Sequence, residues 1–137
     1  METVTAFVSR EADACWRVFT DIAQLTSWVP GLRSAEILTM ERGLPAEIHF
    51  EYGAFAYTLI YSYDRANREV RWQPKLGKLE GVTGFARFEP DGAGTKLTYG
   101  LEPGPSRTEP LELEPLVAAF AHRMDDLASL SESDSKH

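Results

Sequence analysis

The segment Trp28-Val-Pro-Gly31 separates two parts of the chain that have different hydrophobic periods. Proline lacks the backbone N–H that a helix needs, and glycine adopts positive φ readily, so a Pro-Gly pair ends a helix and turns the backbone. Before the pair, apolar residues recur at helical spacing, whereas from Arg33 to Glu102 they alternate with polar residues. The sequence therefore predicts short helices followed by a long run of strands.

Six strands are predicted after this junction, because each alternating run ends at a turn signal. The turn signals are Gly53-Ala54, Arg65–Arg68, Leu76-Gly77 and Asp91–Gly94, which are typical of antiparallel hairpins. The predicted strands are 33–41, 45–52, 55–64, 69–74, 78–89 and 95–102. An opening strand at 3–8 brings the predicted sheet to seven strands.

Helices are predicted on both sides of the strand region. Ser9 is suited to cap a first helix, whose inward face would hold Cys15, Val18, Phe19 and Ile22. A second short helix is expected at about 23–28. After three prolines that break the strand pattern, a long helix is expected from Pro115, with an apolar stripe of Leu116, Phe120, Met124, Leu127 and Leu130. We expect one α+β domain over residues 1–130 and a disordered polar tail at 131–137.

Composition limits the classes of partner. With 137 residues and 43% hydrophobic content the chain has the size of one domain, and its net charge of −7 argues against nucleic acid, which binds basic surfaces. The single cysteine, Cys15, excludes an intrachain disulfide and is expected to be buried. His49, His122 and His137 have no metal-ligand spacing, so we expect no metal and no cofactor. No apolar run approaches the about 18 residues of a membrane span, so we expect a cytoplasmic protein without an integral membrane segment.

Alternation also sorts the strand residues onto two faces of the predicted sheet. The apolar, aromatic face collects Ile48, Phe50, Tyr52, Phe55, Tyr57, Leu59, Tyr61, Tyr63, Val70, Trp72, Val82, Ala86, Phe88, Leu97, Tyr99 and Leu101. The polar face collects His49, Glu51, Ser62, Arg71, Arg87, Lys96 and Thr98. One helix does not readily fill the concavity of seven curved strands, and Gly81, Gly84 and Ala86 leave space beside one strand. Two alternatives stay open: a cavity lined by rings, or an ordinary filled core.

Seven residues are candidate ligand contacts, because they offer ring area or an adaptable thioether on the apolar face or the helix stripe. They are Tyr57, Tyr61, Trp72, Phe88, Tyr99, Phe120 and Met124. Glu80 shares the parity of Val82, so it either turns inward, where it can act as an acid, a base or a hydrogen-bond anchor, or sits at the rim in water. Because no Ser/His/Asp arrangement or paired carboxylate motif is evident, Glu80 is the one weak candidate for a catalytic residue.

Several local sequences resemble one protein family, and they occur in the family's order. They are Cys15–Asp21, Trp28–Leu38, Tyr57–Asp64, Val70–Trp72, Phe88–Pro90 and Gly94–Tyr99. With the order of strands and helices, they resemble the SRPBCC superfamily of START and birch-pollen-allergen-like proteins, and within it the bacterial polyketide cyclase/dehydrase and lipid-transport branch. The likeness covers about residues 2–130. It implies a helix-grip fold, in which a curved seven-stranded antiparallel sheet packs around two short helices and a long C-terminal helix.

This resemblance implies several functions on one scaffold. Our first hypothesis is binding or transport of a small hydrophobic or aromatic ligand between the sheet and the C-terminal helix. The alternative is an enzyme of polyketide cyclase, dehydratase or aromatase type, with Glu80 as proton carrier and Tyr57 or Tyr61 orienting a carbonyl. The resemblance implies an interior arginine in cyclase members, whereas Arg71 and Arg87 fall by parity on the outer face. A third interpretation is a module that grips a protein segment in the same groove.

Overall fold

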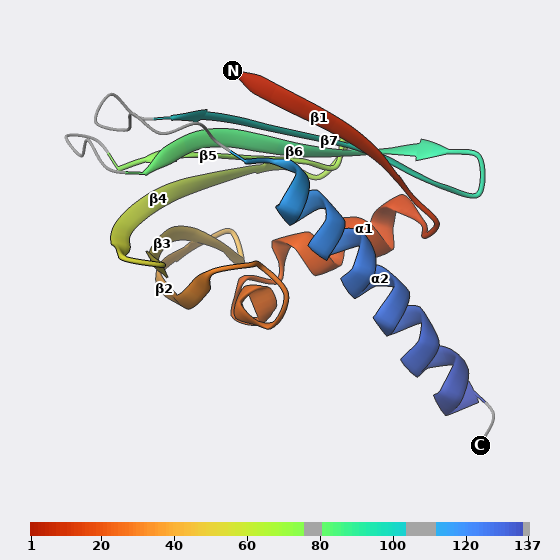
Figure 1. Ribbon diagram of the computed structural model, residues 1–137. Coiled ribbons are helices and arrows are strands. Elements are labelled where there is room, and N and C mark those ends of the chain that lie inside the picture. Colours follow the sequence, from red (N-terminus) through yellow and green to blue (C-terminus); the bar gives the residue numbers. More distant parts are fainter. Residues whose placement is uncertain (76–80, 104–111, 136–137) are drawn as a thin grey trace.

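The computed structural model describes residues 1–75, 81–103 and 112–135 of the chain (Figure 1). In chain order the elements are β1 (Glu2–Val8), α1 (Ala12–Thr20), the 3-10 helix η1 (Ile22–Ser27), β2 (Leu32–Glu41), β3 (Leu44–Tyr52), β4 (Phe55–Asp64), β5 (Glu69–Pro74), β6 (Val82–Asp91), β7 (Gly94–Pro103) and α2 (Glu114–Ser135). The fold is α+β and has the helix-grip arrangement that the sequence predicts. No described helix combines the length and the apolar character that crossing a membrane requires.

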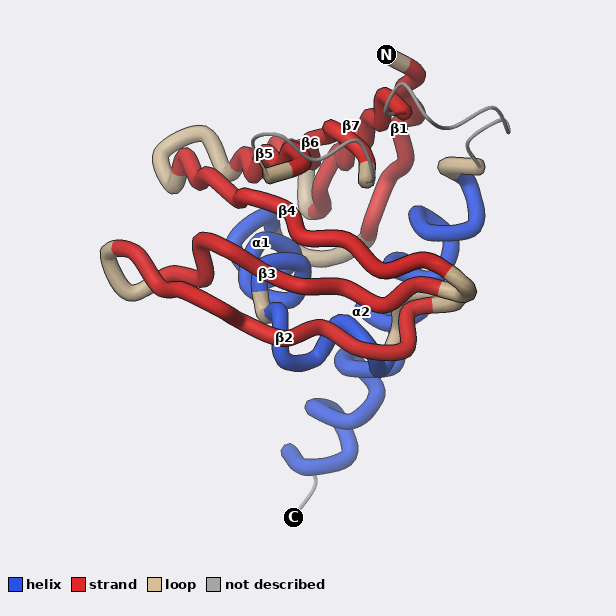
Figure 2. The backbone as a smooth tube through the Cα atoms, turned by 90° about the vertical axis from the view of Figure 1, so that its left-hand side faces the viewer, coloured by secondary structure: helices blue, strands red, loops and turns tan. Residues whose placement is uncertain are grey.

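The seven strands form one antiparallel sheet in the spatial order β1-β7-β6-β5-β4-β3-β2. Strands from β2 to β7 pair with their neighbours in sequence, and β1 pairs with β7. Figures 1 and 2 show β2, β3 and β4 curving away from the plane of β5, β6 and β7, with α1 and α2 on the hollow side. The sheet therefore has a concave face toward the helices and a convex face away from them.

The Pro30-Gly31 junction fixes the end of η1 against the turn between β3 and β4. Gly31 has a φ of +79°, which L side chains rarely adopt, and its carbonyl accepts a hydrogen bond of 3.0 Å from the N–H of Gly53. A Cβ at position 31 would lie 3.3 Å from the ring of Tyr52. The chain turns here because glycine adopts this positive φ without strain, and the absence of a Cβ also avoids crowding the ring of Tyr52.

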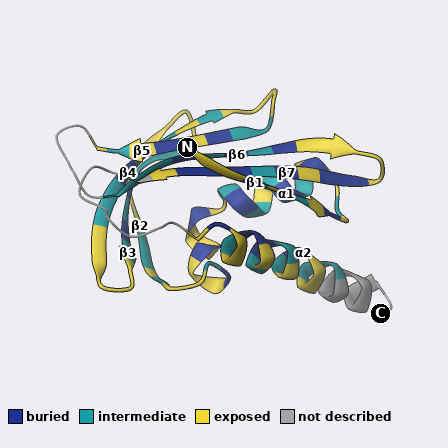
Figure 3. Ribbon diagram, turned by 45° about the horizontal axis from the view of Figure 1, so that its top comes forward, coloured by how far each residue is buried: buried dark blue, intermediate teal, exposed yellow. Residues whose placement is uncertain are grey.

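An aromatic core connects the helices to the sheet. Phe19 of α1 is 5% exposed, and its ring centroid lies 5.4 Å from that of Phe88 on β6 and 5.7 Å from that of Phe120 on α2. It also lies 5.8 Å from the ring of Trp28, directly after η1. Figure 3 shows the burial pattern, and along β5 and β6 the buried positions alternate with less buried ones. Phe19 thus stands where α1, α2 and the concave face meet.

Several element boundaries differ from the sequence prediction, many by a single residue, and they include those of η1, β6 and the end of α2. The short helix is a 3-10 helix at Ile22–Ser27, and β6 continues to Asp91, which pairs with Gly94 across a two-residue turn containing Gly92 at φ +61°. The predicted start of that strand, residues 78–80, lies outside the described residues. Helix α2 continues to Ser135, because no glycine or proline after residue 130 stops it. It includes most of the segment for which the sequence predicts disorder, and residues 136–137 lie outside the described part of the chain.

Candidate functional site

A cavity of about 600 Å³ lies between the concave face, the η1–β2 junction and the start of α2. We call it the cavity below. Its lining consists of Phe19, Leu25, Trp28, Val29, Pro30, Gly31, Leu32, Phe50, Tyr52, Phe55, Tyr57, Leu59, Tyr61, Trp72, Val82, Tyr99, Leu101, Glu112, Pro115 and Leu116. Of the two alternatives that the sequence leaves open, the structure has the cavity lined by rings.

The cavity has an open end and a closed end. Phe55 and Tyr52, on either side of the β3–β4 turn, are 58% and 39% exposed and mark the open end. Trp72, Tyr99 and Leu59 are buried and form the closed end. A molecule that enters beside the β3–β4 turn therefore passes from exposed rings to buried ones.

Aromatic rings in contact with one another form the wall of the cavity on the central strands. Tyr61 on β4 stacks on its cross-strand partner Trp72 on β5, with centroids 5.6 Å apart and planes at 25°. Phe50 on β3 lies 6.1 Å from Tyr61, and Tyr99 on β7 lies 5.9 Å from Trp72. Aromatic side chains have few rotatable bonds, so ring contacts of this kind hold a wall of fixed shape.

Two phenol groups in this wall are kept neutral. Burial raises the pKa of Tyr61 well above its ordinary value of 10.0, and the neighbouring tyrosines add to the shift. Burial likewise raises the pKa of Tyr99. The structure records no hydrogen bond from either hydroxyl to another described residue. Because a neutral phenol is both a donor and an acceptor, these two groups are available to a polar atom inside the cavity.

Four of the seven predicted contact residues line the cavity: Tyr57, Tyr61, Trp72 and Tyr99. The other three, Phe88, Phe120 and Met124, are not part of the lining and are at most 1% exposed. Phe19 separates the cavity from Phe88 and Phe120, since its ring packs against both. Glu80 lies outside the described residues.

Sequence reasoning missed several lining residues. Phe19 is predicted only as part of the inward face of the first helix, and nothing in the helix period says that it faces a cavity. The space expected beside Gly84 is filled instead, because the indole of Trp72 lies against that glycine. Phe50 and Phe55 belong to the apolar face that alternation identifies, so strand parity is the signal that finds them.

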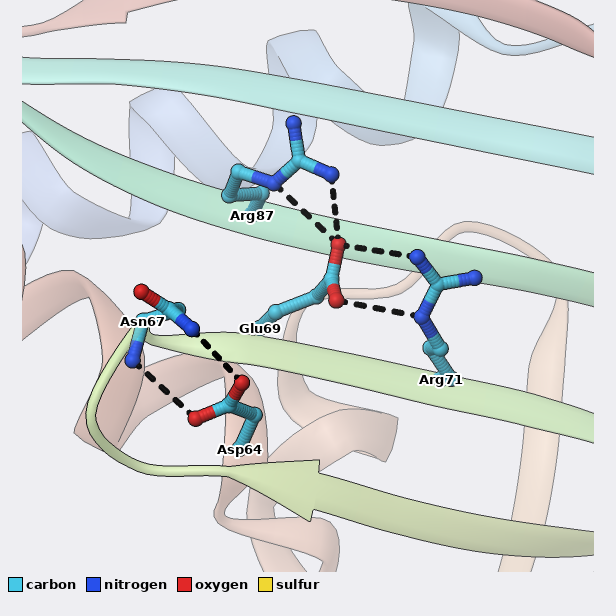
Figure 4. Close-up of polar contacts among 5 residues, drawn as sticks. All are labelled: Asp64, Asn67, Glu69, Arg71 and Arg87. Carbon is cyan, nitrogen blue, oxygen red and sulfur yellow. Dashed lines mark hydrogen bonds and ion pairs between the residues drawn. The ribbon is translucent and has the colours of Figure 1, made fainter.

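Charged groups gather on the convex face, away from the cavity (Figure 4). The carboxylate of Glu69 accepts hydrogen bonds from Arg71 at 3.0 and 3.2 Å and from Arg87 at 2.7 and 3.1 Å. Both guanidinium groups also lie 5.6 Å from the ring centroid of Phe85. Partial burial opposes ionisation of Glu69, but the hydrogen bonds from Arg87 and Arg71 outweigh it and hold its pKa below the ordinary value. The predicted outer placement of both arginines is confirmed.

Comparison of the sequence with models of known protein families identifies the family of this chain. The family model described as polyketide cyclase / dehydrase and lipid transport matches residues 2–132. The chain belongs to this family. No curated protein sequence matches the chain at a significant level.

Solved structures of low sequence identity share the fold of this chain. A protein from Thermus thermophilus has 19% identity and a TM-score of 0.70, with 93% of this chain and 97% of that one covered. A START superfamily protein from Mycobacterium smegmatis has 16% identity and a TM-score of 0.67, with 97% and 94% covered. The di-domain ARO/CYC protein StfQ of the steffimycin biosynthetic pathway has 16% identity and a TM-score of 0.69, with 89% of this chain and 44% of that one covered. At these identities the likeness shows the fold.

Proposed function

We propose that this chain binds or carries a neutral, hydrophobic small molecule with an aromatic or other flat ring system. The observation that carries the proposal is the ring-lined cavity of about 600 Å³, in which the hydroxyls of Tyr61 and Tyr99 make no hydrogen bond to another described residue. Small-molecule sites commonly have volumes of about 300–1,000 Å³ and combine apolar walls with a few polar groups. The cavity has both properties.

The lining favours an uncharged ligand. Among the described lining residues the charged side chain is Glu112, which is exposed at the open end. Burying an ion without a partner costs more free energy than the rings return, so an anionic group would stay outside. Each phenol that gains an acceptor contributes about 0.5–1.5 kcal/mol, and a carbonyl or hydroxyl oxygen on the ligand is the matching acceptor.

Family membership supports an apolar ligand, since its description names both polyketide chemistry and lipid transport. The chain's net charge of −7 and the absence of any described helix suited to cross a membrane fit a carrier that works in the cytoplasm. We propose that the binding partner is a small molecule and not nucleic acid.

Native mass spectrometry of freshly purified protein tests the proposal directly. The expected result is a co-purified adduct that leaves on denaturation. In parallel, prodan, a neutral naphthyl ketone whose emission shifts to shorter wavelength in apolar surroundings, should bind and show this shift. A ligand-free mass together with no prodan binding would contradict the proposal.

A pair of tryptophan variants locates the binding. Trp72 lines the cavity, whereas Trp16 packs edge-on against Tyr63 with centroids 6.1 Å apart and is not part of the lining. Trp72→Phe should weaken prodan binding about tenfold, because it removes part of the closed end. Trp16→Phe, the matched control, should leave it unchanged, and equal losses in both variants would argue for a general effect on folding.

A second candidate function is catalysis of the polyketide cyclase, dehydratase or aromatase type. The neutral phenols of Tyr61 and Tyr99 favour it, because they can donate to the carbonyl oxygen of a substrate. Glu80 is the proposed proton carrier. Glu80→Gln should abolish turnover of a linear polyketone thioester and leave prodan binding intact, and equal loss of both, or of neither, would contradict this role.

A further inference from the structure

A second, smaller hollow of about 200 Å³ lies on the same side of the sheet as the cavity. It is lined by Glu41, Arg42, Leu44, Ala46, Tyr61, Ser62 and Tyr63, so it lies under the hairpin that joins β2 and β3. Tyr61 is the residue that this lining shares with that of the cavity. We call this space the second hollow.

The two spaces follow one another along β4. Tyr57, Leu59, Tyr61 and Tyr63 alternate along this strand and so lie on the same face. Tyr57 and Leu59 line only the cavity, and Tyr63 lines only the second hollow. Tyr61 therefore stands between them, and the second hollow continues the cavity beyond its closed end.

Ring contacts hold Tyr61 in this position. Its ring stacks on Trp72, 5.6 Å away on the cavity side, and lies 6.1 Å from Tyr63 on the other side. The hydroxyl of Tyr63 donates a 2.7 Å hydrogen bond to the carbonyl of Pro45, which fixes that ring in the hairpin. Tyr61 has no such bond to a described residue. The ring contacts account for an aromatic side chain at position 61, but they do not account for its being tyrosine rather than phenylalanine.

Among the described residues the enclosed side-chain polar atoms without a partner are Nε1 of Trp28 and Nε of Arg123, so the hydroxyl of Tyr61 is open to the space that this residue lines. Phenylalanine would give the same packing but would present no hydrogen-bond donor there. The hydroxyl is accounted for if a bound molecule accepts its hydrogen bond. We propose that Tyr61 is a specificity-determining residue that closes the inner end of the cavity, limits the length of the ligand, and donates a hydrogen bond to a carbonyl or hydroxyl oxygen at the ligand's inner end. This inference rests on the proposed binding function and assigns a role to one residue within it.

Two substitutions separate the two parts of this role. Tyr61→Ala removes the ring and should join the cavity to the second hollow. Tyr61→Phe keeps the ring and removes only the hydroxyl. Tyr63→Phe is the matched control, because it removes a tyrosine hydroxyl from the next ring along the strand, outside the cavity.

The length test uses prodan and its homologue with a hexanoyl chain. Each further buried CH₂ contributes about 0.8 kcal/mol, so three additional groups that enter the second hollow raise affinity strongly. In Tyr61→Ala the affinity ratio of the hexanoyl to the propionyl probe should rise at least about tenfold over wild type. An unchanged ratio would overturn the length-limiting role. If Tyr61→Ala does not fold, Tyr61→Leu provides the same test with a shorter side chain than tyrosine.

The hydrogen-bond test compares prodan with its analogue in which CH₂ replaces the carbonyl, measured by competition. Tyr61→Phe should reduce the preference for the ketone about two- to tenfold, and Tyr63→Phe should leave it unchanged. Equal effects of the two variants would overturn the assignment of the hydroxyl.

A crystal structure of Tyr61→Ala tests the partition without any ligand. One continuous cavity is the expected result, and collapse of Tyr63 or Leu44 into the vacated space would overturn it. Probe binding by the wild-type protein distinguishes failure of the proposed function from failure of the role assigned to Tyr61. Wild-type protein that binds no probe contradicts the proposed function, whereas wild-type protein that binds prodan with the same length limit as the alanine variant contradicts only the role of Tyr61.

Discussion

The indole of Trp72 occupies the space in front of Gly84, its cross-strand partner on β6. A Cβ at position 84 would lie 2.7 Å from Nε1 of the indole and 2.6 Å from the carbonyl oxygen of Gly100 on β7. The carbonyl belongs to the backbone of a central strand, so it does not move aside at low cost. Because Gly84 has no side chain, the indole of Trp72, the largest ring in the wall of the cavity, can lie against the sheet at this position.

Gly84→Ala should therefore destabilise the protein and disturb the cavity. Overpacking of this kind costs about 1–3 kcal/mol, and the displaced indole should weaken prodan binding. Urea unfolding and a prodan titration measure the two effects. Gly92→Ala is the control, because Gly92 lies in the β6–β7 turn with no atom within 4 Å of an added Cβ, and only its φ of +61° opposes the change. The control should leave prodan binding unchanged, and equal effects of the two variants on binding would contradict the role of Gly84.

Phe19 and Phe55 both line the cavity, but they should differ in what they stabilise. Phe19 is 5% exposed and contacts the rings of both α2 and the sheet, so Phe19→Ala should lower the free energy of unfolding by about 3–5 kcal/mol. Phe55 is 58% exposed at the open end, so Phe55→Ala should change stability by no more than about 0.5 kcal/mol while weakening prodan binding. Chemical denaturation of both variants checks this order, and a larger stability loss for Phe55→Ala would contradict it.

The parts of the cavity that come from strands could be predicted, because alternation is a local property of the chain. Once each strand is placed, parity decides which face a side chain lies on, and hairpin pairing carries the assignment to the next strand. This reasoning places Tyr57, Tyr61, Trp72 and Tyr99 on the concave face and Arg71 on the convex face, and the structure agrees on each. It needs no knowledge of how distant elements pack.

The position of the helices could not be predicted in the same way. A helical stripe shows which side of α1 or α2 is buried, but not which helix lies nearer to the sheet at a given point. Phe19 reaches between the cavity and the rings of Phe88 and Phe120, and this arrangement depends on contacts between segments far apart in sequence. The sequence prediction therefore includes two residues that lie behind Phe19 and omits Phe19 itself.

Thr95 at the start of β7 should contribute more to stability than its size suggests. Its side chain is fully buried, and its hydroxyl donates a 2.6 Å hydrogen bond to the carbonyl of Arg10 in the link between β1 and α1. Thr95→Val keeps the shape but leaves that carbonyl with only the weak 3.9 Å hydrogen bond from the thiol of Cys15, so the free energy of unfolding should fall by about 1–2 kcal/mol. Thr98→Val, on the polar convex face, is the matched control with little expected effect. Equal losses in thermal unfolding would show that the bond to Arg10 is unimportant.

The carboxylate of Glu69 should make the free energy of unfolding depend on pH in the acidic range. Its pKa in the folded protein lies below the ordinary value of 4.5, because the hydrogen bonds from Arg87 and Arg71 outweigh the opposing effect of partial burial. A folded pKa below the unfolded one means that the stabilisation is fully present above about pH 4.5 and is lost as the pH falls through the folded pKa. Because solvent screens the pair, the contribution at neutral pH is about 0.5–1 kcal/mol.

Glu69→Gln should therefore be less stable than wild type at pH 7 by about this amount, and the difference should vanish in acid below the folded pKa. Glu51→Gln is the matched control, since Glu51 faces Arg33 at 3.6 Å with both side chains exposed, and a pair of that kind contributes little. Urea unfolding at a series of pH values measures both. A Glu69→Gln difference that persists unchanged in acid would show that the ion pairs with Arg71 and Arg87 are not its source, because protonation removes those pairs from the wild type as well.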